Sequence, residues 1–107
     1  MGVPIALATF EAVRAWFFAA ARARAREPRV MTFASAFTLN LAWTRAWLRD
    51  ALANADVVLA DGVGIEAYGR LAERPFPEDL NAAALFPRLF ASADPARPLR
   101  VFLYGAA

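Results

Sequence analysis

The chain has 107 residues, 60% of them hydrophobic, with a net charge of +2, and all twelve of its basic residues are arginine. Since it lacks cysteine, histidine and lysine, it cannot form a Cys/His zinc site, a Ser-His-Asp triad, a thiol nucleophile, a Schiff base or a P-loop. Acid–base chemistry near neutral pH therefore falls to Asp, Glu or Tyr. The small net charge argues against nucleic acid as a partner, and no apolar run approaches the roughly 20 residues of a membrane-spanning helix.

The predicted elements alternate between strands and helices along the chain. Thr9 is a suitable N-cap for the first helix, and Glu11 in its first turn favours the helix dipole. In chain order we predict a strand at 2–8, a helix from Thr9 to about Arg26, a strand at 28–33, a long helix at 37–53, a strand at 56–60, helices at 63–73 and 82–91, and a strand at 100–104. This order predicts an α/β fold with a mainly parallel sheet and flanking helices.

Two further apolar regions are predicted to be buried, a pair of tryptophans and the last predicted strand. Trp43 and Trp47, four residues apart, are interpreted as core residues, with a sugar-stacking platform as the alternative. The strand at 100–104 is expected to be buried, and it runs into a glycine where a crossover helix would normally follow. We therefore interpret residues 1–107 as a single α/β domain that is the N-terminal half of a larger Rossmann-like domain, whose missing neighbours would favour self-association.

Asp61 directly follows the predicted strand at 56–60, which is continuously apolar over 57–60, and precedes Gly62 and Gly64. In open α/β sheets, ligands bind beyond the carboxyl ends of the strands, where Asp61 would lie. Asp is also a favoured N-cap, and the two glycines permit a tight turn into a helix. Spacing alone leaves both interpretations open, a helix cap and a functional acid.

The stretch GVGIEA at 62–67 also matches a dinucleotide-binding pattern, G-x-G-x-x-A between a strand and a helix. That pattern requires an acidic residue about 20 positions later, at the end of a second strand. Glu78 and Asp79 instead lie in a proline-containing loop. A dinucleotide-binding module is thus an alternative that rests on one short match.

Three ordered segments resemble a known family: ALANADVVLADGVGIEAYGRL, RPFPEDLNAAALFPRLF and LRVFLYGAA. They are similar to the first half of the WecB/TagA/CpsF glycosyltransferases, glycosyltransferase family 26. The resemblance implies a Rossmann-like enzyme that moves an N-acetylmannosamine-type sugar from a UDP-sugar donor to a lipid-linked acceptor in cell-surface polysaccharide synthesis. It implies no required metal or other cofactor, and a cytoplasmic location that includes the inner face of the cell membrane. Peripheral membrane association of the full-length protein and a homo-oligomer are compatible with it.

The resemblance also assigns roles to individual residues. Asp61 matches the aspartate proposed as general base, which takes the proton from the acceptor hydroxyl, and Gly62 lets substrate approach the backbone. Thr32 matches a threonine that makes a polar contact in the same cleft. Gly105 opens the loop that begins the nucleotide-binding half. We expect Thr32 and Asp61 to lie at the carboxyl ends of neighbouring parallel strands and to face one cleft.

The chain also departs from the family pattern. Where the family has an asparagine after the threonine, this chain has Ala34 or Ser35, so Ser35 is the candidate polar contact there. Where the family reads Asn-Leu-x-Gly-Thr-Asp, this chain reads Asp79-Leu80-Asn81 followed by alanines at 82–84, and Asn81 is a candidate substrate-binding residue. These alanines support an alternative function, a non-catalytic relative that keeps the fold without the activity.

Overall fold

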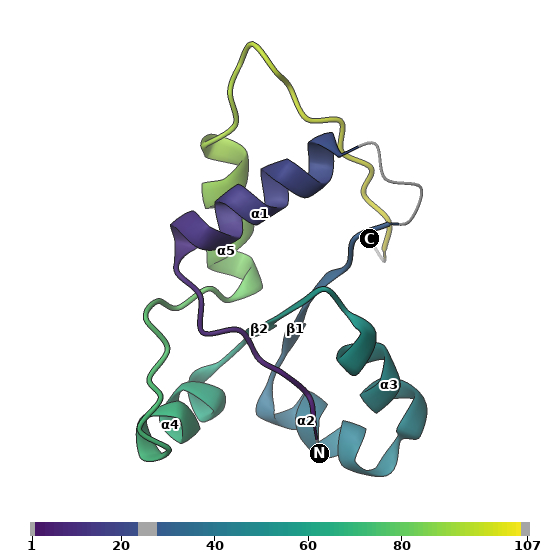
Figure 1. Ribbon diagram of the computed structural model, residues 1–107, viewed down its shortest axis with the longest axis vertical. Helices are drawn as coiled ribbons and strands as arrows, with labels where there is room; N and C mark the ends of the chain where they lie inside the picture. The colour runs from purple at the N-terminus through teal and green to yellow at the C-terminus, as the bar shows by residue number, and fades with distance from the viewer. Residues whose placement is uncertain (1, 24–27, 106–107) are drawn as a thin grey trace.

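The computed structural model describes residues 2–23 and 28–105 of the chain (Figure 1). Two strands are separated and flanked by helical segments along the chain, as the sequence predicted for residues 10–71. The described elements are α1 (Phe10–Arg22), β1 (Met31–Ala34), α2 (Ala36–Thr44), α3 (Ala46–Asn54), β2 (Val57–Ala60), α4 (Val63–Leu71) and α5 (Ala82–Ala91). The predicted α/β class is confirmed, and the arrangement is that of an incomplete Rossmann-like domain.

The two described strands form a parallel pair. Their register runs from Met31 opposite Val57 to Ala34 opposite Ala60. The apolar stretch that predicted β2 is buried at its centre, since Val58 and Leu59 are almost inaccessible to solvent. The predicted parallel arrangement is therefore confirmed.

Side-chain alternation along the strands divides the core into two clusters. On one face, Leu59 packs with Phe10 and Val13 of α1 and with Leu85 and Leu89 of α5. On the other face, Val58 and Ala34 pack with Ala42 of α2 and Leu52 of α3. Helices therefore flank both faces of the sheet, α1 and α5 on one side and α2 and α3 on the other (Figure 1).

The predicted first strand, 2–8, is not a strand in the structure. The segment lies against β2, and Ala6 N donates a hydrogen bond to Val58 O at 2.8 Å. Pro4 has no N–H to donate, so it cannot contribute to a regular ladder. The prediction was wrong about the type of element, although the segment does contact the sheet.

The predicted long helix, 37–53, is two helices separated by Arg45, which has extended backbone angles of −115° and 98°. Leu39 and Leu48 both pack against the second core cluster. They are nine residues apart, which is two and a half helical turns, so a straight helix would place them on opposite faces. The break at Arg45 allows both leucines to face the sheet.

The remaining helices follow their predictions closely. Thr9 caps α1 as expected, because its Oγ1 accepts a hydrogen bond from Ala12 N at 3.2 Å. The helix ends at Arg22, before the predicted end near Arg26, and residues 24–27 lie outside the described part. The predicted bounds of α5 are confirmed, and α4 ends two residues before its predicted end.

Two predictions of burial were wrong. Trp43 and Trp47 are 68% and 69% exposed, so they are not core residues. Segment 100–104 forms no strand and is exposed throughout, with Phe102 at 87% and Tyr104 at 95%. A strand needs a neighbour for its backbone groups, and within the described residues β1 and β2 pair only with each other.

Candidate functional site

The carboxyl ends of β1 and β2 bring two helix starts together. Ser35 links β1 to α2, and Asp61 and Gly62 link β2 to α4. Asp61 N donates to Ala34 O at 3.0 Å, which continues the pairing of the strands one step beyond β2. A Cβ built on Gly64 would lie 3.4 Å from the Ala36 Cβ, so the first turns of α2 and α4 are in contact. Unpaired N–H groups of two helices therefore converge at this edge, an arrangement that favours negative charge.

Asp61 is half-buried at this edge, and it does not cap α4. The N-cap is Gly62, and no side chain caps this helix. Within residues 2–23 and 28–105, the Asp61 carboxylate makes no hydrogen bond or ion pair. The structure thus gives no support to the helix-cap interpretation and leaves both carboxylate oxygens unengaged.

Gly62 has a backbone conformation that favours glycine. Its φ and ψ are 100° and 161°, in a region that other residues adopt only with strain. A Cβ at this position would meet no atom within 4 Å, so the backbone angle, rather than crowding, is the constraint. The glycine sets the direction in which the chain leaves β2 and thereby the position of Asp61.

Ser35 occupies the corresponding place after β1. Its Oγ accepts a hydrogen bond from Thr38 N at 3.1 Å and lies 3.0 Å from Thr38 Oγ1. Ser35 therefore caps α2, and the pair places two hydroxyl groups at the same edge as Asp61. Sequence analysis missed Thr38, although its spacing of three from Ser35 is the spacing of an N-cap and its partner.

Thr32 lies inside β1, two residues before its end, and is paired with Val58. Strand alternation places Thr32 on the same face as Ala34 and Val58, toward α2 and α3. The structure thus brings Ser35 and Asp61 to one edge, with Thr32 further back along the sheet.

The two remaining candidates lie outside this edge. Asn81 caps α5, because its Oδ1 accepts from Ala84 N at 3.0 Å, and its own side chain is held by Asp79 Oδ1 at 3.0 Å. Ala82, Ala83 and Ala84 form the first turn of that helix. Gly105 follows the exposed segment 100–104.

A second aspartate lies at the opposite end of β2. Asp56 Oδ2 accepts a hydrogen bond from Val30 N at 2.7 Å, and Oδ1 lies 3.5 Å from Arg29 Nη1. The Val30 hydrogen bond, with a smaller contribution from Arg29, lowers the pKa of the Asp56 carboxyl below its ordinary value. This aspartate joins the amino ends of the two strands and has a structural role.

Glu78 is a further residue whose role sequence analysis missed. Its Oε1 accepts from Phe10 N at 3.1 Å, and its Oε2 pairs with Arg88 Nη1 at 3.5 Å. Glu78 thereby caps α1 from a loop far along the chain and connects α1 to α5. No local sequence signal could have identified a contact across 68 residues.

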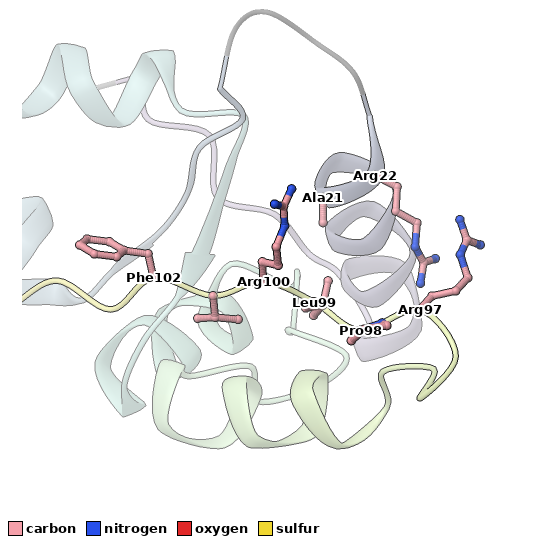
Figure 2. A pocket seen from close by; sticks show the side chains of 8 residues that line it. Ala21, Arg22, Arg97, Pro98, Leu99, Arg100 and Phe102 are labelled. Atoms are coloured by element: carbon pink, nitrogen blue, oxygen red, sulfur yellow. The ribbon is translucent and has the colours of Figure 1, made fainter.

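A hollow of about 650 Å³ lies near the C-terminal end of α1 (Figure 2). Arg22, Arg97 and Arg100 line it, together with apolar side chains of segment 98–102. The hollow lies beside the C-terminal end of α1, which points toward the amino ends of the strands (Figure 1), whereas Asp61 follows the carboxyl end of β2. It is therefore separate from the candidate site.

Comparison with known proteins identifies one family. The model of the glycosyl transferase WecG/TagA/CpsF family matches residues 1–107. No curated protein matches the chain. None of the helices that the structure describes is long and apolar enough to cross a membrane.

Proposed function

Because the chain belongs to the glycosyl transferase WecG/TagA/CpsF family, we propose that it forms the N-terminal portion of an enzyme that moves an N-acetylmannosamine-type sugar. The donor would be a UDP-sugar and the acceptor a lipid-linked sugar of cell-surface polysaccharide synthesis. The resemblance of the segments around Asp61, Asn81 and Gly105 to this family supports the finer assignment of substrates.

The proposal rests on the Asp61 carboxylate and its lack of bonding partners among the described residues. Its carboxylate has no side-chain or backbone partner among the described residues, and it lies where α/β sheets bind ligands. A carboxylate with free oxygens can accept a proton from a bound hydroxyl. We therefore assign Asp61 the role of general base.

In the proposed step, the acceptor hydroxyl attacks the anomeric carbon of the donor sugar. A C–O bond forms to the acceptor while the C–O bond to the diphosphate breaks, and UDP leaves with the bonding electrons. The hydroxyl proton passes to the Asp61 carboxylate. The adjacent N-terminal turns of α2 and α4 offer N–H groups that favour the negative charge developing on the diphosphate.

The test is a measurement of UDP release by the full-length enzyme that contains this chain. We expect release from UDP-N-acetylmannosamine only when a lipid-linked glucosamine acceptor is present, and we expect Asp61→Asn to remove most of it. UDP-N-acetylglucosamine is the matched control donor. Release that does not require the acceptor, or an Asp61→Asn enzyme as fast as wild type, would contradict the proposal.

The start of α5 favours a second candidate, a non-catalytic relative. Ala82, Ala83 and Ala84 place no polar side chain in the first turn, where the family pattern has glycine, threonine and aspartate. Converting them by Ala82→Gly, Ala83→Thr and Ala84→Asp in the full-length protein separates the two candidates. Activity that appears only in the triple variant would identify the natural chain as the non-catalytic form.

A further inference from the structure

Three arginines line the hollow beside the C-terminal end of α1, and the candidate site uses none of them. Arg22 comes from the last turn of α1, whereas Arg97 and Arg100 come from the segment after α5. Figure 2 shows Arg22 and Arg97 extending toward the same space, with Arg100 on the other side of Ala21. Two parts of the chain that are distant in sequence therefore bring their positive charges to one hollow.

Among the described residues, no carboxylate balances these charges. None of the residues that line the hollow is acidic, and the ion pairs that the described residues form lie elsewhere. The acidic residue nearest to Arg97 along the chain is Asp94, and its Oδ1 accepts a hydrogen bond from Ala96 N at 2.9 Å. The hollow therefore has a positive potential that an anionic ligand would neutralise.

Contacts with the rest of the chain position two of the arginines. The Arg22 Cζ lies 5.1 Å from the centre of the Phe18 ring, and the Arg14 Cζ lies at the same distance from that ring. Arg14 Nη2 also donates to Ser92 O at 3.0 Å, which ties the segment after α5 to α1. Arg97 N closes the turn from which its side chain extends, by a 2.9 Å hydrogen bond to the carbonyl three residues earlier. Such positioning lowers the entropy cost of binding a ligand.

We propose that this space between Arg22, Arg97 and Arg100, which we call the arginine hollow, binds the diphosphate group of a small molecule. Guanidinium groups bind phosphoryl oxygens through paired, charge-assisted hydrogen bonds. The positive charges lie on both sides of Ala21, so an extended anion reaches them better than a single phosphate does. A phosphate monoester also carries a charge of only about −2, which is less than the three arginines can balance.

The size and the apolar part of the lining favour a small molecule. The volume of about 650 Å³ is within the range of small-molecule sites. Leu99 and Phe102 lie beside the arginines, and the Phe102 side chain is exposed. An exposed aromatic ring can stack on a nucleobase, so a nucleoside diphosphate would use both kinds of side chain, whereas inorganic pyrophosphate would use the arginines alone. Occupancy of the arginine hollow does not depend on the proposed function, because Asp61 lies elsewhere, after β2.

The experiment measures binding of inorganic pyrophosphate to the 107-residue chain by isothermal titration calorimetry at low salt. We expect saturable binding that weakens as salt is added, because the arginines are exposed to solvent. The double variant Arg22→Gln, Arg97→Gln should raise the Kd about tenfold or more, since it removes two charge-assisted contacts. The matched control is Arg45→Gln, Arg70→Gln, which removes the same charge from exposed arginines outside the hollow and should leave the Kd within about twofold.

A single substitution gives a second test that makes little demand on folding. Arg100→Gln changes an exposed side chain outside every described helix and strand, and it should raise the Kd about threefold or more. Circular dichroism checks that each variant keeps the helix content of the wild type.

ADP distinguishes the two sources of a diphosphate group, and its base differs from that of the proposed donor. If the ligand is a nucleoside diphosphate, ADP binds more tightly than pyrophosphate, and Phe102→Ser weakens ADP binding by about fivefold or more without affecting pyrophosphate. Equal affinities and no effect of Phe102→Ser would identify the free anion as the ligand.

Several results would overturn the proposal. One is an absence of pyrophosphate binding by the wild type, and another is wild-type affinity in both the double variant and Arg100→Gln. An equal loss in the Arg45→Gln, Arg70→Gln control would assign the affinity to net charge instead of the hollow. Tighter binding of an aspartate-rich peptide than of pyrophosphate or ADP would assign the hollow to an acidic protein segment.

Discussion

The two ends of β2 each carry an aspartate, and the two side chains are in opposite situations. Asp56, before the strand, accepts a hydrogen bond from Val30 N and pairs with Arg29. Asp61, after the strand, has neither kind of partner among the described residues. One strand of four residues thus separates a carboxylate used for assembly from a carboxylate left free.

This difference follows from the geometry of a parallel pair. At the amino ends, the chain that enters β1 has a free backbone N–H within reach of Asp56. At the carboxyl ends, the chain turns into helices whose N–H groups are oriented toward the edge of the sheet. A carboxylate there is close to donors without being bound by one, which suits a residue that has to bind substrate.

The largest expected effect is on turnover of the full-length enzyme. Asp61→Asn should lower kcat by about 10²–10⁴-fold with donor binding nearly unchanged, because the amide keeps the shape but cannot accept a proton. The matched control, Asp56→Asn, should leave kcat within about threefold, since that residue is distant from the reacting groups. Steady-state kinetics of both variants measure this difference. Equal losses of kcat would show that the two aspartates do not differ in their role in catalysis.

The strand between the aspartates should be the most sensitive to truncation. Leu59 is 1% exposed and packs against α1 and α5, so Leu59→Ala should reduce the free energy of unfolding by about 2–5 kcal/mol. Leu71→Ala, at an exposed position on α4, should change it by less than about 0.5 kcal/mol. Urea denaturation followed by circular dichroism compares them, and similar midpoints would show that β2 is not central to the core.

In the turn after β2, substitution of Gly62 should lower the free energy of unfolding, whereas substitution of Gly64 should be tolerated. Gly62→Ala forces alanine into a positive-φ conformation and should cost about 1–3 kcal/mol of unfolding free energy. Gly64→Ala should be tolerated or slightly stabilising, because Gly64 is helical and the added Cβ makes an ordinary contact with Ala36. Thermal unfolding of both variants provides the test, and the reverse order would refute the assigned turn.

The smallest expected effect is the pH dependence due to Asp56. Its pKa is lowered in the folded state, so its contribution to stability is present above the ordinary Asp pKa of about 3.9 and is lost as the pH falls through the folded value. Asp56→Asn should remove that part of the acid sensitivity. Urea midpoints measured between neutral pH and acid check this, and parallel profiles for variant and wild type would mean that the Val30 contact does not persist in solution.

Much of the fold could be predicted because its signals are local. The apolar run of β2, the cap at Thr9 and the bounds of α5 each depend on a few adjacent residues. The break at Arg45 could not be predicted, since it reflects the demand that Leu39 and Leu48 reach the same core. The exposure of 100–104 likewise depends on which strands are present to pair with it.

The position of the candidate site could be predicted from the sequence, but whether the Asp61 side chain caps a helix or stays free could not. Sequence analysis placed Asp61 at the end of a buried strand, which the structure confirms, while its catalytic role stays a prediction. A helix cap and a free acid require the same residue at the same place, so the two roles differ only in the backbone geometry at Gly62, which makes Gly62 the N-cap of α4. The contact of Glu78 with α1 joins distant parts of the chain, and no spacing rule describes such a contact.

The exposed segment Val101–Tyr104 has a consequence for handling the protein. Four successive apolar or aromatic residues with open backbone groups are a template for pairing with the same segment of another chain. Pro98 and Arg100 precede it, and such residues limit the growth of intermolecular sheets but leave the four apolar residues exposed. Because of this exposed segment, we expect loss of soluble protein at high concentration to begin here. A charge placed at Phe102 should raise the concentration at which precipitation starts.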